Sequence, residues 1–592
     1  MSTHEDRLRA LRAQLSRESL DGFVVPLTDE YLSEYVGAYA QRLAWLTGFL
    51  GSAGSAVVLP EEAAIFTDGR YTLQVRDQVD GAHWQFESVP QTSVAAWLGD
   101  HAPAGGRIGY DPWLHTRRWV EDATSALAKK GAILVPVESN PVDAVWDDRP
   151  HPSKARLIPH EDRYAGRSSA AKRADMADWM KAQDVDATVL TALDSIAWTF
   201  NIRGADVTHT PVALAYALLH ADGKAEMFVD PAKIDADVRA HLGNAVTLLD
   251  RAEFITALGG LTGKTVAVDP DRAVSAIFEA LDKANATIKP LRDPAVLPKA
   301  VKNETEITGH KAAQARDGAA MAKFLRWLSI EGPKGGQTEI SVSDRLQAFR
   351  EETGALVDLS FDTISGSGPN GAIVHYKASA ETCRPVESGT LLLVDSGGQY
   401  RDGTTDITRT MAIGTPSDEM RHRFTLVLKG HIALACARFP AGTRGSQLDV
   451  LARQFLWAEA LDYAHGTGHG VGSFLSVHEG PQRIATASGD EPLQPGMILS
   501  NEPGYYKTGA YGIRIENLVL VVESGTGEND RPWYAFETLS HTPIDRVLIE
   551  VEALTPAERD WVNAYHARTL EIVGPQLEGE DKAWLEAACA PL

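Results

Sequence analysis

The feature that most restricts the fold of this chain is a pair of aspartates on either side of a glycine-rich turn. Asp395 closes an apolar run over 391–394, and the turn that follows returns the chain to Asp406. This pattern predicts a hairpin with a carboxylate at matching places on both arms. One such carboxylate could pair with an arginine or cap a turn, but two close carboxylates repel each other unless a cation lies between them. The pattern therefore favours a hairpin built around a cation.

Histidines and glycines alternate further along the chain. His465, His469 and His478 lie close together in a stretch whose glycines would let the backbone approach a ligand or an ion. The spacing matches neither the dinucleotide fingerprint nor a Walker loop, so a phosphate site is disfavoured. Each histidine alone could equally be an ordinary core or surface residue. Their clustering favours a functional site.

Two glutamates lie in apolar settings that predict strands over 498–500 and 513–520. Glu502 follows the first of these segments, and Glu516 lies inside the second. Arg514 and Glu516 are two residues apart and would share one face of a strand. A plain Arg514–Glu516 ion pair is therefore an alternative to a metal-binding role.

Together these motifs offer four carboxylates and one imidazole as candidate metal ligands: Asp395, Asp406, His469, Glu502 and Glu516. A set rich in oxygen and without thiolate suits two divalent ions such as Mn²⁺ or Co²⁺ better than a structural zinc. Two neighbouring ions can share a water, lower its pKa and stabilise the tetrahedral intermediate of hydrolysis. The predicted chemistry is amide hydrolysis.

The chain is long enough for several domains, and two seams rich in proline or charge divide it at 147–152 and 298–303. We expect domains over 1–150, 151–302 and 303–592. The first two share similar short segments and are interpreted as a duplicated α/β unit, with two unrelated domains as the alternative.

The third domain is predicted to be α+β with an antiparallel sheet. Asn303 and Glu306 form a capping-box pattern at the start of a helix, and Val342, Leu346 and Phe349 follow a helical spacing.

Composition limits the partners and the location of the protein. A net charge of −23 argues against binding to nucleic acid. The three cysteines are too few and too scattered for a disulfide framework or a thiolate metal site, which indicates a reducing compartment. We find neither a secretory signal nor an apolar stretch that could span a bilayer, so we expect a cytoplasmic protein without a membrane partner.

In its motifs the chain resembles the pita-bread metallopeptidases of family M24, and within them the three-domain cytosolic Xaa-Pro aminopeptidases. The resemblance covers essentially the whole chain and is carried by residues 51–54, 67–71, 370–376, 402–410, 465–474, 478–481, 502–506 and 560–563. It implies two creatinase-like N-terminal α/β domains followed by a C-terminal pita-bread catalytic domain. It also implies removal of an N-terminal residue that is followed by proline.

The resemblance further implies a role for each metal ligand. Asp395 would bind one ion in bidentate fashion, and His469 and Glu502 would complete the other. Asp406 and Glu516 would bridge the two ions, which we expect to be manganese, with cobalt or zinc as alternatives.

Other roles follow from the same resemblance. Glu502 would take the proton from the bridging water. His375 would steady the oxyanion or the scissile carbonyl, while His478 and His465 would orient the substrate. Arg70 would contact the substrate from the first domain. The expected partners are peptides with proline in second position and a second copy of the chain in a homodimer.

Three alternatives remain open at this point. A prolidase would cut only dipeptides, and a creatinase-like hydrolase would use the same fold without metal. A non-catalytic pita-bread module would bind peptides but lack one or more of the five ligands, all of which are present in this sequence.

Overall fold

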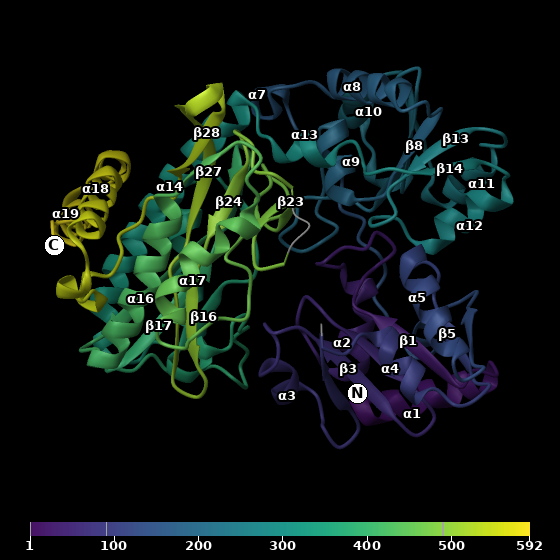
Figure 1. Ribbon diagram of the computed structural model, residues 1–592, viewed down its shortest axis with the longest axis horizontal. Coiled ribbons are helices and arrows are strands. Elements are labelled where there is room, and N and C mark those ends of the chain that lie inside the picture. Colours follow the sequence, from purple (N-terminus) through teal and green to yellow (C-terminus); the bar gives the residue numbers. More distant parts are fainter. Residues whose placement is uncertain (1, 90, 488–490) are drawn as a thin grey trace. The chain divides into compact units, whose positions relative to one another are not determined.

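The computed structural model describes residues 2–89, 91–487 and 491–592 (Figure 1). The chain divides into two compact units. The first comprises Met1–Asp162 and Arg167–Val296, and the second comprises Arg163–Gly166 and Leu297–Leu592. Each unit has its own sheets and its own hydrophobic core.

Two six-stranded sheets of the same topology form the first unit. Their orders are β4-β3-β2-β1-β5-β6 and β12-β11-β10-β8-β13-β14. In both sheets one inner strand, β2 or β10, is antiparallel to its two neighbours, and the other neighbouring pairs are parallel. The identical order and directions confirm the predicted duplication. The strands are β1 (Gly22–Pro26), β2 (Ser55–Val58), β3 (Ala63–Thr67), β4 (Gln85–Ser88), β5 (Arg107–Tyr110), β6 (Ile133–Pro136), β8 (Ala187–Leu190), β10 (Ala215–His220), β11 (Ala225–Val229), β12 (Val246–Leu249), β13 (Thr265–Val268) and β14 (Thr287–Pro290).

Equivalent helices follow the first strand of each repeat. Helix α2 (Arg42–Thr47) ends at Gly48 and α9 (Leu193–Phe200) ends at Asn201, both in the left-handed conformation that these two residue types tolerate. The short segments that are similar in the two repeats include these two helix ends. The other helices of the unit are α1 (His4–Arg17), α3 (Gln74–Gln78), α4 (Val94–His101), α5 (Arg117–Ala128), α6 (Pro141–Val145), α8 (Ser169–Ala182), α10 (Ala236–Leu242), α11 (Phe254–Gly259) and α12 (Ser275–Lys283).

The second unit is built on an antiparallel six-stranded sheet of order β21-β28-β27-β24-β22-β23. A three-stranded sheet, β16-β17-β20, and the hairpin β25-β26 accompany it, which confirms the predicted α+β class. The strands are β16 (Ile364–Ser367), β17 (Thr390–Ser396), β20 (Ile407–Ile413), β21 (Arg438–Pro440), β22 (Gly468–Gly470), β23 (Glu479–Ile484), β24 (Ile498–Asn501), β25 (Gly504–Lys507), β26 (Tyr511–Arg514), β27 (Asn517–Thr526) and β28 (Pro532–Thr538).

The helices of the second unit begin where the sequence predicted. The Asn303 side chain accepts hydrogen bonds from the backbone of Thr305 and Glu306, and the Glu306 side chain accepts one from the Asn303 backbone, so the capping box is confirmed. The main helices are α14 (Glu304–Glu331), α15 (Glu339–Glu351), α16 (Asp418–Ala435), α17 (Asp449–Trp457), α18 (Pro556–Val573) and α19 (Gly579–Ala588). Figure 1 shows α14, α16 and α17 beside the strands of this unit, with α18 and α19 next to α14.

Two details of the predicted strands are wrong. Strands β17 and β20 do pair as a hairpin, but Asp395 lies opposite Thr408, and Asp406 precedes β20 instead of facing Asp395. The turn is not simple either, because it contains β18 (Gly398–Tyr400) and β19 (Gly403–Thr404), which pair with each other. The expected strand over 513–520 is interrupted before Asn517, since β26 pairs in the small hairpin and β27 in the large sheet. Glu516 lies where the chain crosses between them.

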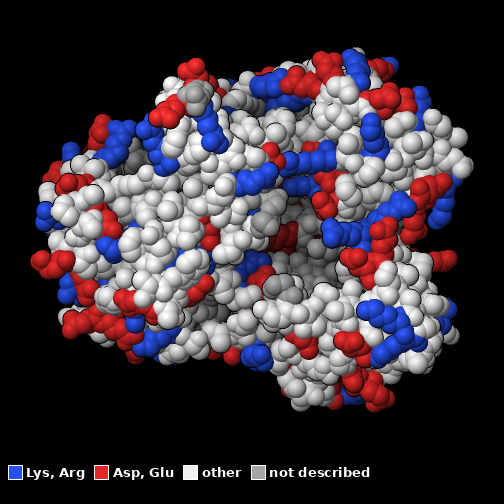
Figure 2. All heavy atoms as spheres, viewed as in Figure 1, with Lys and Arg blue, Asp and Glu red and all other residues white. Residues whose placement is uncertain are grey.

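Figure 2 shows Lys and Arg interspersed with Asp and Glu over the face that it presents, so neither sign of charge dominates there. Among the helices of the described segments, none combines the length and the apolarity that crossing a bilayer requires.

Candidate metal centre

Side chains from five separate places in the second unit converge at the ends of its strands. Asp395 lies near the end of β17, Asp406 precedes β20, His469 lies in β22, Glu502 follows β24, and Glu516 lies between β26 and β27. Ligand atoms of three of them lie within 4.8 Å of one another: Asp406, His469 and Glu516. Strand pairing therefore brings together residues that are far apart in the sequence.

His469 connects Glu502 to this cluster. Its Nε2 lies 3.6 Å from Glu502 Oε1 and 3.5 Å from Asp406 Oδ2. The other ring nitrogen, Nδ1, is 2.9 Å from the carbonyl oxygen of Gly470, to which it donates. That hydrogen bond fixes the ring so that Nε2 faces the carboxylates, as is common for metal-binding histidines.

Asp395 contributes an oxygen that lacks a hydrogen-bond partner. Its Oδ2 accepts a hydrogen bond of 2.6 Å from Arg514 Nη2, whereas Oδ1 is buried and has no hydrogen-bond partner among the described residues. Burial raises the pKa of Asp395 to about 6, with Arg514 opposing the rise and Asp406 and Glu502 adding to it. A buried carboxylate oxygen without a donor is a natural cation ligand.

The two glutamates show the same electrostatic conflict. Burial, followed by repulsion from Asp406, Asp395 and Glu502, holds the pKa of Glu516 well above its ordinary value. Burial also raises the pKa of Glu502, although His469 and Arg514 oppose the rise. Thr408 Oγ1 donates a hydrogen bond of 2.8 Å to Glu516 Oε2.

The pKa of His469 reflects the excess of negative charge around its ring. Burial alone would lower its pKa, but the hydrogen bond that the ring donates to Asp406 and the charge of Glu502 outweigh burial and raise the pKa to about 9. The carboxylates thus hold a proton on the ring where a metal ion would otherwise bind. Oxygen-rich donors, one imidazole and uncompensated negative charge fit divalent cations.

Two of the predicted substrate-binding histidines, His478 and His465, lie beside members of this cluster. The rings of His478 and His469 meet edge to face with centroids 4.3 Å apart. His465 Nδ1 is 3.9 Å from Glu502 Oε2, and its Nε2 is 2.9 Å from the hydroxyl of Tyr506. His375 directly follows Val374, whose carbonyl oxygen accepts a 3.4 Å hydrogen bond from Arg514 Nη1.

Arg70 belongs to the first unit and forms ion pairs of 2.7 Å with Asp68 and 3.7 Å with Glu34. Burial opposes its charge, but Asp68, Tyr71 and Glu34 together raise its pKa above the ordinary value. Its contact with substrate stays a prediction.

The structure gives other partners to Arg514, for which the sequence suggested an ion pair with Glu516. Arg514 is 1% exposed, and besides Asp395 it donates to Tyr506 at 2.6 Å and to Thr408 at 3.2 Å. Arg514 thereby joins the Asp395 strand, the hydroxyl that supports His465 and the threonine that supports Glu516. Tyr506 stood in a motif that carried the resemblance, but no pattern in the sequence indicated its partner.

Comparisons with known proteins match the whole chain. Residues 308–523 match the model of metallopeptidase family M24, residues 7–145 and 148–306 each match a creatinase/prolidase N-terminal domain, and residues 532–592 match the C-terminal region of peptidase M24. The chain is 41% identical to "Probable Xaa-Pro aminopeptidase P" of Laccaria bicolor, over 99% of this chain and 93% of that protein. It is 40% identical to "Aminopeptidase P2" of Arabidopsis thaliana, over 99% and 88%.

A solved structure matches over the full length of both chains. It is the X-prolyl aminopeptidase of Caenorhabditis elegans, described as a cytosolic enzyme with a di-nuclear active site, with a TM-score of 0.95, 34% identity and 100% of each chain covered. The fold of the present chain, including both N-terminal repeats, is thus the fold of that enzyme.

Proposed function

The chain belongs to metallopeptidase family M24, and from this premise we propose that it is an Xaa-Pro aminopeptidase, which removes the N-terminal residue from peptides with proline in second position. The observation that carries the proposal is the convergence of four carboxylates, three of them buried, and one imidazole in a chain similar from end to end to such enzymes. One carboxylate oxygen of that set has no hydrogen-bond partner within the described residues.

Two divalent ions are the proposed cofactor, with manganese as the expected metal and cobalt or zinc as alternatives. When bound, they supply an activated water and positive charge for the carbonyl oxygen. The residues proposed to hold them are Asp395, Asp406, His469, Glu502 and Glu516.

The remaining proposed roles belong to side chains around the metals. Glu502 accepts the proton of the attacking water, which its position beside His469 supports. His375 stabilises the charge that develops on the scissile carbonyl, and His478 and His465 orient the substrate. Arg70 is proposed to contact the substrate from the first unit.

The requirement for proline has a physical basis. The proline nitrogen carries no hydrogen once it is in a peptide bond, and its ring fixes φ, so peptidases that hold extended substrates by backbone hydrogen bonds bind it poorly. An enzyme for such peptides needs an apolar notch for the ring and a wall that admits one residue before it.

We further propose three domains over 1–150, 151–302 and 303–592, a homodimer and a cytoplasmic location. Separate family matches over 7–145 and 148–306 support two N-terminal domains. The description of the nematode enzyme as cytosolic supports the location.

The decisive experiment measures turnover of three substrates, Xaa-Pro-Xaa, Xaa-Ala-Xaa and the dipeptide Xaa-Pro, with manganese and with a chelator. We expect metal-dependent cleavage of Xaa-Pro-Xaa and little cleavage of the alanine peptide. Cleavage of the dipeptide alone would indicate a prolidase. Binding of peptides without turnover, by protein loaded with metal, would indicate a non-catalytic module.

A further inference from the structure

We propose that the C-terminal helix α18 (Pro556–Val573) positions Glu502 and Glu516 through a hydrogen-bonded support formed by Tyr565, Arg409, Asn517 and His431. The inference rests on the metal centre proposed above and assigns a role to the C-terminal region of the chain. None of the four supporting residues is a proposed metal or substrate ligand. We call this set the glutamate support.

The two glutamates are attached to paired asparagines. Asn501 ends β24 immediately before Glu502, and Asn517 begins β27 immediately after Glu516. The two asparagines lie opposite each other in the antiparallel register of these strands. A side chain that binds both asparagines therefore fixes the backbone next to both glutamates.

His431 of α16 holds both asparagines and is 1% exposed. Its Nδ1 lies 3.1 Å from the carbonyl oxygen of Asn501, and the Asn501 side chain donates a 3.0 Å hydrogen bond to the His431 carbonyl. Its Nε2 lies 3.1 Å from Asn517 Nδ2. One imidazole thus connects the strand before Glu502 to the strand after Glu516.

The partners of Asn517 determine the direction of each hydrogen bond. The Tyr565 hydroxyl lies 3.2 Å from Asn517 Oδ1, but its single proton also has the carbonyl oxygens of Thr542 at 2.9 Å and Ser540 at 3.1 Å as acceptors. Asn517 Oδ1 accepts a 2.9 Å hydrogen bond from Arg409 Nη2 in any case. Its amide nitrogen must therefore donate to His431 Nε2, which must be unprotonated. The ring then carries its proton on Nδ1 and donates to the carbonyl oxygen of Asn501.

Arg409 ties this chain to the backbone of Glu516. Its Nη1 donates to the carbonyl oxygen of Glu516 at 2.6 Å and to that of Thr408 at 2.8 Å, and Nη2 also donates to Thr542 at 2.7 Å and Tyr565 at 2.8 Å. The guanidinium group is 2% exposed, and all of these acceptors are neutral. Its charge is therefore not cancelled locally and acts on the buried carboxylate of Glu516.

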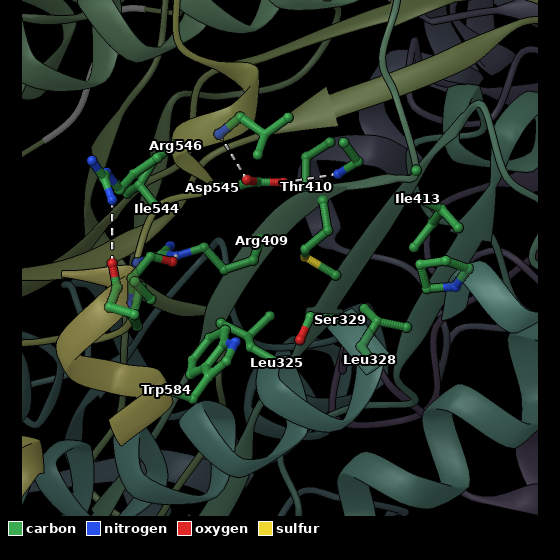
Figure 3. Close-up of a pocket in the computed structure, with 18 residues that line it drawn as sticks. Leu325, Leu328, Ser329, Arg409, Thr410, Ile413, Ile544, Asp545, Arg546 and Trp584 are labelled. Carbon is green, nitrogen blue, oxygen red and sulfur yellow. Dashed lines mark hydrogen bonds between the residues drawn. The ribbon is translucent and has the colours of Figure 1, made fainter. Parts of the chain in front are cut away.

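Arg409 is buried and also lines a cavity of about 460 Å³ whose other lining residues are mostly apolar. Figure 3 shows Leu325 and Trp584 near it. The hydrogen bonds of its guanidinium group to protein atoms therefore lie in a largely apolar setting, where a hydrogen bond is stronger than in water.

Helix α18 supplies the outer end of the support. The Tyr565 hydroxyl contacts Arg409 and Asn517 and also accepts a hydrogen bond of 3.1 Å from the backbone of Thr542. Trp561, one turn earlier, stacks on Tyr565 with ring centroids 5.3 Å apart and meets His431 edge to face at 5.8 Å. The same helix thus contacts both the Glu516 side and the Glu502 side of the support.

The test is the affinity of the chelator-treated full-length protein for Mn²⁺, measured by titration calorimetry. Tyr565→Phe removes one hydroxyl from the support. Thr569→Val is its matched control, because Thr569 lies one turn later and its hydroxyl donates, among the described residues, to the Tyr565 carbonyl alone, at 2.9 Å. Altered support of metal ligands typically weakens metal binding by about 10- to 100-fold. We expect a loss of about tenfold for Tyr565→Phe and none for Thr569→Val.

A second variant, His431→Gln, interrupts the support on the Glu502 side and should also weaken Mn²⁺ binding. At saturating Mn²⁺ both variants should regain most of their kcat, with KM for an Xaa-Pro-Xaa peptide unchanged, because neither residue touches substrate. The inference is overturned if both variants fold and bind Mn²⁺ within about twofold of the unmodified protein. Equal weakening by Thr569→Val would also overturn it, since the effect would then be general destabilisation. Failure of the unmodified protein to bind Mn²⁺ would instead reject the metal centre itself.

Discussion

Replacing Glu516 by glutamine should change the stability of the metal-free and the metal-loaded protein in opposite directions. Glu516 is 1% exposed, and its pKa is held well above the ordinary value by burial and then by Asp406, Asp395 and Glu502. A carboxyl group that holds its proton more tightly in the folded state loses stability as pH rises above the unfolded pKa. Without metal, Glu516 therefore destabilises the fold at neutral pH.

The size of this penalty follows from the interval between the unfolded pKa and the working pH. Starting from the ordinary value of 4.5, the penalty at pH 7 is at most about 3.5 kcal/mol, at about 1.4 kcal/mol per pH unit. Glutamine does not ionise and can still accept the 2.8 Å hydrogen bond from Thr408. We expect the free energy of unfolding of the chelated protein to rise by about 1–3 kcal/mol, which is a rise in Tm of roughly 2–6 °C for a unit of this size.

With metal bound, the unmodified protein should be more stable than Glu516→Gln. A ligand present at about 100 times its Kd stabilises the folded state by about 2.7 kcal/mol, and a variant that lacks one ligand gains less. Scanning calorimetry of the catalytic transition, in chelator and in Mn²⁺, measures both effects. Glu523→Gln is the matched control, because Glu523 is exposed on the same strand, β27, and should shift neither transition. A lower Tm for Glu516→Gln in chelator would refute the reasoning, because it would mean that the charge of Glu516 is stabilising without metal.

Three further predictions follow from the site. Glu502→Gln should reduce kcat at saturating metal by about 10²- to 10⁴-fold, the usual contribution of a general base, and steady-state turnover within tenfold of the unmodified enzyme would contradict this role. The raised pKa of Asp395, about 6, predicts that the Tm of the chelated protein falls as pH rises from about 4 through 6, so a Tm that rises over this interval, measured by calorimetry, would oppose it. Glu479→Gln leaves the buried cations Lys299 and Lys302 without their carboxylate and should cost about 3–5 kcal/mol in denaturant unfolding, whereas a loss below about 1 kcal/mol would show that the lysines find other partners.

Local patterns in the sequence were sufficient for the elements and for the choice of candidate ligands. The capping box at Asn303 marked the start of α14, because its hydrogen bonds join residues within three positions of each other. The apolar run before Asp395 gave β17 for the same reason, since alternation and turn chemistry act over short distances. The strand through Glu516 was wrong because nothing local indicates that the chain leaves one sheet for another there.

The sequence by itself determined which side chains can bind metal and the order in which they follow one another. Only the tertiary structure decided how they are held. Arg409 and His431 looked like ordinary strand and helix residues, yet strand pairing brings Arg409 to the Glu516 carbonyl and His431 between Asn501 and Asn517. The physical reason is that these hydrogen bonds join residues about 70 to 107 positions apart, so their partners exist only once the sheet has assembled and excluded water.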